Sequence, residues 1–261
     1  MAEGSSVSGG TGRIAVTASD DVMKVDLVRD RLARAQRIVV LTGAGISAES
    51  GVPTFRGEGG LWRQHRALDL ATPQAFARDP RLVWEFYNWR REVLGPLEPN
   101  PGHNALVKLE QRVPQFTLIT QNIDGLHARA GSRNILELHG NIWHVRCLGC
   151  GTVAEDRSVL PPMPRCPGCG ALLRPHVVWF GESLDPSILS TAFEAVQHAE
   201  IVMVIGTSGT VEPAASMGMV AKRRGACLVE INLEPTPFTT LYDTSILGKS
   251  GEILPMICES W

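Results

Sequence analysis

The chain lacks any run of about 18 apolar residues, which is the length that a helix needs to cross a bilayer. Residues 1–21 also lack the apolar stretch of a secretory signal. No charge of one sign dominates, because 25 Lys and Arg face 27 Asp and Glu in 261 residues. Such a balance does not favour nucleic acid or an anionic membrane surface as a partner. We therefore expect a soluble, cytoplasmic protein with neither partner.

Cysteine is scarce as well, and six cysteines are too few to hold a chain of this length together by disulfides. Four of them form two Cys-x-x-Cys pairs, a spacing typical of a tetrahedral zinc site. These candidate ligands are Cys147, Cys150, Cys166 and Cys169. Four thiolates leave no coordination position open, so one structural Zn²⁺ is expected, with paired disulfides or an iron–sulfur cluster as alternatives. Cys227 and Cys258 lie in apolar sequence and are expected to be buried and inert.

Four short apolar runs predict the strands of one sheet. They cover residues 38–41, 116–119, 201–205 and 227–231, and each is followed by polar residues or glycine. Helix-like stretches separate them, and the first has helically spaced apolar residues from Val25 to Ala35. This alternation predicts an α/β fold with a Rossmann-like open parallel sheet. Ligands of such sheets bind beyond the carboxyl ends of the strands.

Two segments interrupt this alternation. Residues 57–101 are rich in aromatic residues and arginine and predict a helical insertion. Residues 144–175 hold the cysteine pairs among glycines and prolines and predict a small zinc-binding module. The large domain then comprises residues 20–143 and 176–261. Residues 1–19 are rich in Gly, Ser, Thr and Ala and are expected to form a flexible tail.

A glycine-rich motif follows the first predicted strand at residues 43–48. It fits the dinucleotide fingerprint Gly-x-Gly-x-x-Gly/Ala, in which glycines let pyrophosphate approach a helix N-terminus. By itself the pattern is also that of an ordinary strand-to-helix turn. A dehydrogenase would continue with a second strand and an acidic ribose ligand, but this chain continues into the insertion. The motif therefore predicts a nucleotide site without the architecture for hydride transfer.

Polar residues follow later strands too, at residues 121–127 and at 139–141. His139 comes directly after the strand-like residues 135–138 and is a candidate general base near neutral pH. An isolated histidine is more often a hydrogen-bonded structural side chain. Here polar residues from several strand ends should meet at one edge of the sheet, which favours a functional role.

The ordered motifs as a set resemble the sirtuin family of NAD-dependent protein lysine deacylases. The resemblance covers nearly all of residues 23–258. It is carried by residues 43–47, 51–56, 120–127, 139–140, 177–182, 206–208 and 232–234, together with the four paired cysteines.

The resemblance implies that His139 is the general base, that Asn122 assists catalysis, and that Asp124 shapes the nicotinamide and ribose pocket. The nucleotide contacts that it implies are Gly43, Ala44, Gly45, Ser47, Ala48, Thr54, Phe55, Arg56, Trp62, Gln121, Asn122, Ile123, Asp124, Gly206, Thr207, Ser208, Asn232, Leu233, Glu234 and Ser250. The resemblance also implies that Phe55 and Arg56 sit on a mobile loop over NAD.

In the reaction that the resemblance implies, the acyl oxygen of a modified lysine attacks the nicotinamide ribose, and NAD is consumed as a cosubstrate. The products would be free lysine, nicotinamide and O-acyl-ADP-ribose. An acylated protein or peptide would pair with the chain as an added strand through main-chain hydrogen bonds. The segment implied to bind it contains Val177, Trp179, Phe180, Gly181 and Glu182.

Tyr87 and Arg90 have a spacing that places both side chains on one face of a helix. The chain here resembles class III of the family, which removes succinyl, malonyl or glutaryl groups and in which such a pair binds the distal carboxylate. A guanidinium fork and a hydroxyl suit that group. Ala67 matches the small residue that widens the acyl tunnel in this class. The alternative is that Tyr87 and Arg90 are a packed surface pair.

Three other functions remain open at this point: a chain that is mainly a deacetylase, a mono-ADP-ribosyltransferase that uses the same NAD cleavage, and a non-catalytic module that binds acyl-lysine or NAD. The presence of both Asn122 and His139 disfavours the last.

Overall fold

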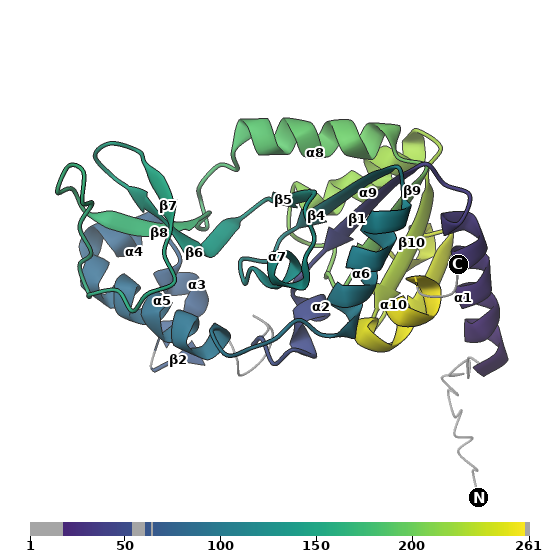
Figure 1. The fold of residues 1–261 in the computed structure, drawn as a ribbon, viewed down its shortest axis with the longest axis horizontal. Coiled ribbons are helices and arrows are strands. Elements are labelled where there is room, and N and C mark those ends of the chain that lie inside the picture. The colour runs from purple at the N-terminus through teal and green to yellow at the C-terminus, as the bar shows by residue number, and fades with distance from the viewer. Residues whose placement is uncertain (1–17, 54–60, 64, 259–261) are drawn as a thin grey trace, which may run out of the picture.

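The structure is a computed structural model, and it describes residues 18–53, 61–63 and 65–258. Its centre is a six-stranded parallel sheet with the order β11-β10-β9-β1-β4-β5 (Figure 1). The strands are β1 (Arg37–Thr42), β4 (Gln115–Thr120), β5 (Ile135–Glu137), β9 (Ile201–Ile205), β10 (Cys227–Asn232) and β11 (Thr244–Leu247). The predicted Rossmann-like α/β fold is confirmed, and all four predicted apolar strands lie in this sheet.

Helices cover both faces of the sheet (Figure 1), which is why apolar side chains dominate its four central strands, β10, β9, β1 and β4. On β1, Ile38 and Val40 join the core under α1 (Ala18–Leu32), α6 (Pro101–Arg112) and α10 (Ser250–Cys258). The alternate residues Val39 and Leu41 join the core under α8 (Pro186–His198) and α9 (Ala214–Arg223). Successive residues of a strand point to opposite faces, so one continuous apolar run fills two cores.

The rest of the chain forms a second lobe at one end of the sheet (Figure 1). It contains α3 (Ala67–Leu70), α4 (Pro73–Arg78), α5 (Pro80–Leu94) and a hairpin of β2 (Leu61–Trp62) with β3 (His65–Arg66). It also contains an antiparallel sheet of β7 (Val153–Glu155), β6 (Gly140–Cys147) and β8 (Leu173–Val177). Helices and cysteine-bearing strands share a single core, and the Trp84 indole donates to the Leu173 carbonyl at 2.8 Å. The two segments that interrupt the sheet in sequence are therefore one body in space.

Several helices begin on the same local signal, a capping side chain followed by proline. The caps are Thr72 for α4, Asp79 for α5, Asn100 for α6 and Asp185 for α8, and each accepts a backbone N–H of its first turn. Proline suits the next position because its missing N–H would have no partner there. The short helices α2 (Ala44–Ala48) and α7 (Leu126–Ala130) begin instead at glycines, directly after β1 and a few residues beyond β4.

Some expectations need correction or extension. The polar strand β11 was not predicted, since its sequence, Thr-Ser-Ile-Leu, lacks an apolar run. Cys258 is fully buried as expected, but Cys227 is only half-buried, and the guanidinium of Arg31 lies 2.6 Å from its sulfur. Among the described residues, no helix is long and apolar enough to cross a membrane.

Candidate active site

The loop after β1 packs directly against the loop after β9. The Gly45 N–H donates to the Gly206 carbonyl at 2.8 Å. A Cβ on Gly45 would lie 2.6 Å from the Gly206 Cα, and a Cβ on Gly206 would lie 2.5 Å from the Ile46 nitrogen. Gly206 also has a φ of +60°, which disfavours other residues. Both positions therefore require glycine, and their contact sets the shape of the predicted nucleotide site.

Polar side chains from several strand ends meet at this edge, as the sequence predicted. The Asn122 amide donates to the Gly43 carbonyl at 3.0 Å and to the Ser47 hydroxyl at 3.2 Å. The Gln121 amide donates to the Thr207 hydroxyl at 3.2 Å, and the Asn232 amide to the Thr207 carbonyl at 2.9 Å. A hydrogen-bonded set that spans β1, β4, β9 and β10 suits a ligand as long as a dinucleotide.

Asp124 lies beneath this edge and is 5% exposed. Its carboxylate accepts the Leu126 N–H at 2.8 Å and a hydrogen bond from Ser47. Burial raises the pKa of the Asp124 carboxyl, while these two donors and the charge of Arg90 oppose the rise. Asp124 is thus placed between the nucleotide loop and helix α5, which carries Arg90.

The hydrogen-bond partner of His139 determines which of its ring nitrogens carries the proton. Its Nδ1 lies 2.8 Å from the Gln121 carbonyl. A carbonyl only accepts hydrogen bonds, so Nδ1 carries the proton. Burial lowers the pKa of His139, and the bond to Gln121 opposes this shift. The ring is therefore neutral at pH 7 and presents Nε2 as a lone pair, which is the state that a general base requires.

Two buried histidines lie beneath the site; His127 ends the predicted polar segment 121–127, whereas His103 was not predicted. His103 Nδ1 accepts the Asn100 N–H at 3.3 Å, so its proton is on Nε2, which lies 3.4 Å from the Ser47 hydroxyl. His127 Nε2 lies 3.0 Å from the Thr42 hydroxyl, and the two imidazole centroids are 4.8 Å apart. Burial lowers the pKa of His103 to about 4 and that of His127 well below its usual value. The only signal for His103 was its place three residues after the helix cap Asn100.

Other predicted nucleotide contacts are placed less uniformly. Ser250 is buried, and its hydroxyl donates to Glu49 beyond the end of α2. Ala48, Leu233 and Glu234 are exposed, whereas Ala44, Ile123 and Ser208 are half-buried. Trp62 packs in the second lobe, 5.6 Å from Phe86 between ring centroids. The predictions for Thr54, Phe55 and Arg56 concern residues outside the described part of the chain.

A small cavity lies in the second lobe beside α5. Ala67 and Arg90 both line it, together with Val52, Pro53, Phe86, Trp89, Val93 and Leu94. Burial lowers the pKa of Arg90, while Tyr87 and Asp124 oppose the shift. The cavity therefore combines an apolar wall with one guanidinium.

Tyr87 lies beside this cavity. Its ring is 5.9 Å from the Arg90 Cζ, and its hydroxyl accepts the Trp179 indole N–H at 2.9 Å. Burial raises the pKa of Tyr87, which is 1% exposed. The pair is not a surface pair, because Tyr87 is inside the lobe.

The predicted peptide-binding segment starts next to His139. The Val178 N–H donates to the His139 carbonyl at 2.9 Å. Strand β8 ends at Val177, so the rest of this segment lies outside the strand. It turns at residues 180–181, with Gly181 at a φ of +86°. The Trp179 N–H donates to the Glu182 carboxylate, and the Phe180 N–H to the Ala71 carbonyl. A peptide strand laid here would have to use carbonyl oxygens instead of these N–H groups.

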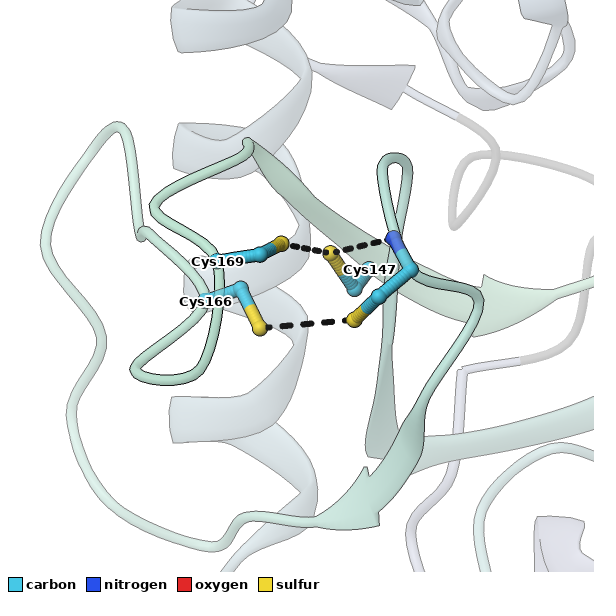
Figure 2. Close-up of side chains that lie close together, drawn as sticks. Cys147, Cys166 and Cys169 are labelled. Carbon is cyan, nitrogen blue, oxygen red and sulfur yellow. Dashed lines mark hydrogen bonds between the residues drawn. The ribbon is translucent and has the colours of Figure 1, made fainter.

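The four paired cysteines come together from the end of β6 and the segments that follow it and precede β8, and Figure 2 labels three of them, Cys147, Cys166 and Cys169. Their sulfur atoms all lie within 4.8 Å of one another, with Cys147 to Cys169 at 3.4 Å and Cys150 to Cys166 at 3.8 Å. Zn–S bonds of about 2.3 Å in a tetrahedron place sulfurs about 3.8 Å apart. The Gly149 N–H also donates to the Cys147 sulfur at 3.3 Å. The cluster fits one structural zinc ion with no position left for substrate.

Comparison with known proteins agrees with this geometry. Residues 43–213 match the model of the Sir2 family. The chain is 52% identical over 233 residues to NAD-dependent protein deacylase 2 of Pyrobaculum aerophilum, covering 89% of this chain and 94% of the relative. It is 47% identical over 255 residues to the mitochondrial NAD-dependent protein deacylase sirtuin-5 of Canis lupus familiaris, covering 87% and 82%.

Solved structures agree as well. A Sir2 homologue in complex with NAD superimposes with a TM-score of 0.85 at 47% identity, covering 90% of this chain and 92% of the homologue. A dinucleotide site at the sheet edge, a closed four-cysteine cluster and relatives of this identity agree with one another. The chain belongs to the Sir2 family and is an NAD-dependent protein lysine deacylase.

Proposed function

We propose that this deacylase removes acidic acyl groups, namely succinyl, malonyl and glutaryl, from protein lysine more efficiently than acetyl. One observation carries the proposal: Arg90 and Ala67 line the same small cavity, and Tyr87 lies beside Arg90 inside the lobe. A guanidinium in an apolar cavity is best stabilised by an anion that it can contact through two parallel hydrogen bonds. A distal carboxylate supplies that anion, whereas an acetyl group does not.

The residues at the sheet edge have separate roles in this proposal. Bound NAD would supply the ribose that takes the acyl group and the nicotinamide that leaves. Gly43, Gly45, Gly206 and the polar side chains around Thr207 would hold the dinucleotide. Asn122 and Asp124, fixed through Ser47, would orient the nicotinamide end.

His139 would take the proton from the ribose hydroxyl at its Nε2 atom. The Gln121 carbonyl keeps the other nitrogen protonated, and burial keeps the ring neutral. The hydrogen bond between Val178 and the His139 carbonyl ties the peptide-binding segment to the base. Peptide binding and proton transfer would therefore be aligned by one short stretch of backbone. We also place the enzyme in the cytoplasm, where thiols stay reduced and can hold zinc.

The test compares one peptide carrying a succinyl, malonyl, glutaryl or acetyl group, with kcat/KM measured at saturating NAD. Arg90→Met should lower the ratio of desuccinylation to deacetylation by at least tenfold, because a charge-assisted bidentate contact is lost. Arg81→Met is the matched control, since Arg81 is an exposed arginine at the start of the same helix. It should leave the ratio within twofold of the wild type.

Equal losses of desuccinylation and deacetylation in Arg90→Met would show that Arg90 supports the fold or NAD binding and does not select the acyl group. A wild-type enzyme that prefers the acetyl peptide over all three acidic ones would also refute the proposal.

A further inference from the structure

A hydrogen bond between two buried aromatic side chains joins the acyl cavity to the peptide-binding segment. The Trp179 Nε1–H donates to the Tyr87 hydroxyl oxygen at 2.9 Å, across 92 positions in sequence. Trp179 is 2% exposed, so water does not compete for this bond. Tyr87 lies on α5 one turn from Arg90, and Trp179 follows β8.

The chemistry of the indole determines what Tyr87 can do. An indole N–H is a donor with no lone pair to offer, whereas a phenol both donates and accepts. The Tyr87 oxygen is therefore the acceptor in this bond, and its own hydrogen remains to be donated. Within the described part of the chain, the Trp179 bond is the only hydrogen bond found for the Tyr87 hydroxyl. The hydrogen is thus left for a group that accepts.

Trp179 is held in place from three sides. The Arg174 guanidinium carbon lies 3.4 Å from the centre of the Trp179 ring, and the Phe76 ring centroid is 5.1 Å away. Arg174 forms two hydrogen bonds with the Glu182 carboxylate, at 2.5 and 2.9 Å. The same carboxylate accepts the Trp179 backbone N–H at 2.8 Å. Rotation of the indole away from Tyr87 would break this packing, so the donor stays aimed at the phenol.

We propose that Trp179 is a positioning residue for acyl selection, which acts by committing the Tyr87 hydroxyl to donate toward a distal carboxylate. This inference rests on the proposed acidic-acyl function. It adds that the preference depends on a residue of the peptide-binding segment as well as on Arg90. A carboxylate accepts at both oxygens, so it satisfies Arg90 and a donating Tyr87 together.

The bond also strengthens the donor. A hydroxyl whose oxygen already accepts a hydrogen bond is polarised and donates more strongly in a buried setting. Without the indole N–H, the phenol oxygen has an unfilled lone pair and the hydroxyl is free to reorient. An acetyl group has no distal carboxylate, so its turnover makes no direct use of the bond. The ratio of the two activities therefore isolates this effect from any general loss.

The experiment is a double-mutant cycle on the ratio of kcat/KM for succinyl and acetyl forms of one peptide at saturating NAD. Trp179→Phe keeps an aromatic ring but removes the N–H, and it should lower the ratio about three- to tenfold, mainly through KM for the succinyl peptide. Tyr87→Phe should lower the ratio at least as much. In the Tyr87→Phe background, adding Trp179→Phe should change the ratio less than twofold.

Two results would overturn the proposal: an unchanged ratio in Trp179→Phe, or an equal fall in that ratio with and without the Tyr87 hydroxyl. The failure of the underlying function gives a different pattern. If the acidic-acyl function is wrong, Arg90→Met and Tyr87→Phe both leave the ratio unchanged. If only the role of Trp179 is wrong, Arg90→Met still lowers the ratio.

A second measurement keeps Trp179 intact and so does not depend on how Trp179→Phe folds. Wild type and Tyr87→Phe are compared on one peptide that bears either a succinyl group or a butyryl group, which has the same chain length but ends in a methyl group. A Tyr87 that donates to the distal carboxylate should matter for the succinyl peptide alone, so Tyr87→Phe should lower succinyl turnover about threefold or more relative to butyryl turnover, because a methyl group accepts no hydrogen bond. Equal losses on the two peptides would overturn the assignment.

Discussion

At the scale of single residues, the state of His139 is set by one backbone carbonyl. The Gln121 carbonyl holds the proton on Nδ1, and burial lowers the pKa of the ring, so Nε2 is available as a base at pH 7. We predict that His139→Tyr lowers kcat on every acyl peptide by about 10² to 10⁴-fold, the usual contribution of a general base. Nicotinamide release coupled to acyl peptide is the measurement.

His198 provides the control for this substitution. Its Nδ1 also lies 2.8 Å from a backbone carbonyl, that of Glu194, but it is on the exposed end of α8. His198→Tyr should keep near-normal turnover. Near-normal turnover in His139→Tyr as well would remove His139 from the mechanism.

At the scale of elements, the start of α6 and the start of α7 each place a histidine under the nucleotide loop. His103 has a folded pKa of about 4, below the ordinary value of 6.5, and the pKa of His127 is also depressed. Between about pH 4 and pH 6.5 the unfolded chain therefore binds more protons than the folded one. Folding stability therefore falls as the pH falls from about 6.5 toward 4. The His103 shift alone corresponds to about 3 kcal/mol across that window.

This dependence can be measured by urea unfolding at pH 7.0, 6.0 and 5.0. The free energy of unfolding should fall across this series, which lies above the range where most carboxylates titrate. His103→Gln removes one of the two titrating groups and should flatten the slope, even if it lowers stability at pH 7. A slope that is unchanged in this variant would mean that other groups carry the acid sensitivity.

At the scale of the whole molecule, the four-cysteine cluster lies in the same lobe as the cavity beside Arg90, which we propose binds the acyl group. Cys147 and Cys166 join the same core as the α5 residues Trp84 and Phe86. Removal of zinc by a strong chelator should therefore abolish acyl-peptide binding and lower the melting temperature of the second lobe, because the buried thiols of Cys147 and Cys166 lose the ion that holds them to the exposed thiols of Cys150 and Cys169. The parallel sheet has its own two cores and should retain most of its structure.

Circular dichroism and calorimetry, with and without chelator, check this expectation. Cys150→Ser should behave like the chelated protein, whereas Cys227→Ser, at a cysteine outside the cluster, should keep its zinc. Chelation that leaves both the melting profile and the acyl-peptide affinity unchanged would contradict a structural role for the metal.

The central sheet could be predicted because β1, β4, β9 and β10 each consist mainly of apolar residues that are buried on both faces, even though Thr117 stands within β4 and Glu230 within β10. β11 could not, since it lies at the sheet edge and its register with β10 depends on neighbours that the local sequence does not show. The strand-end motifs also predicted that polar side chains would gather at one edge of the sheet, where Asn122 bonds Gly43 and Ser47 and His139 bonds the Gln121 carbonyl.

The contacts that support the site residues could not be predicted from the sequence, for a different reason. The contacts of His103 with Ser47 and of Trp179 with Tyr87 join positions 56 and 92 residues apart, and neither has a local pattern. The same holds for the shared core of the two interrupting segments. Such pairs exist only once the elements have packed.

The contact between Gly45 and Gly206 has a consequence for how this site can change. Each glycine excludes a Cβ at the other position by close approach of backbone to backbone. Enlarging either residue alone forces the loops after β1 and β9 apart, and enlarging both makes the collision worse. Neither glycine can therefore be replaced first, because either single substitution already disrupts the site. Attempts to re-engineer the dinucleotide specificity of the enzyme should therefore leave these two positions alone and vary the side chains around Thr207.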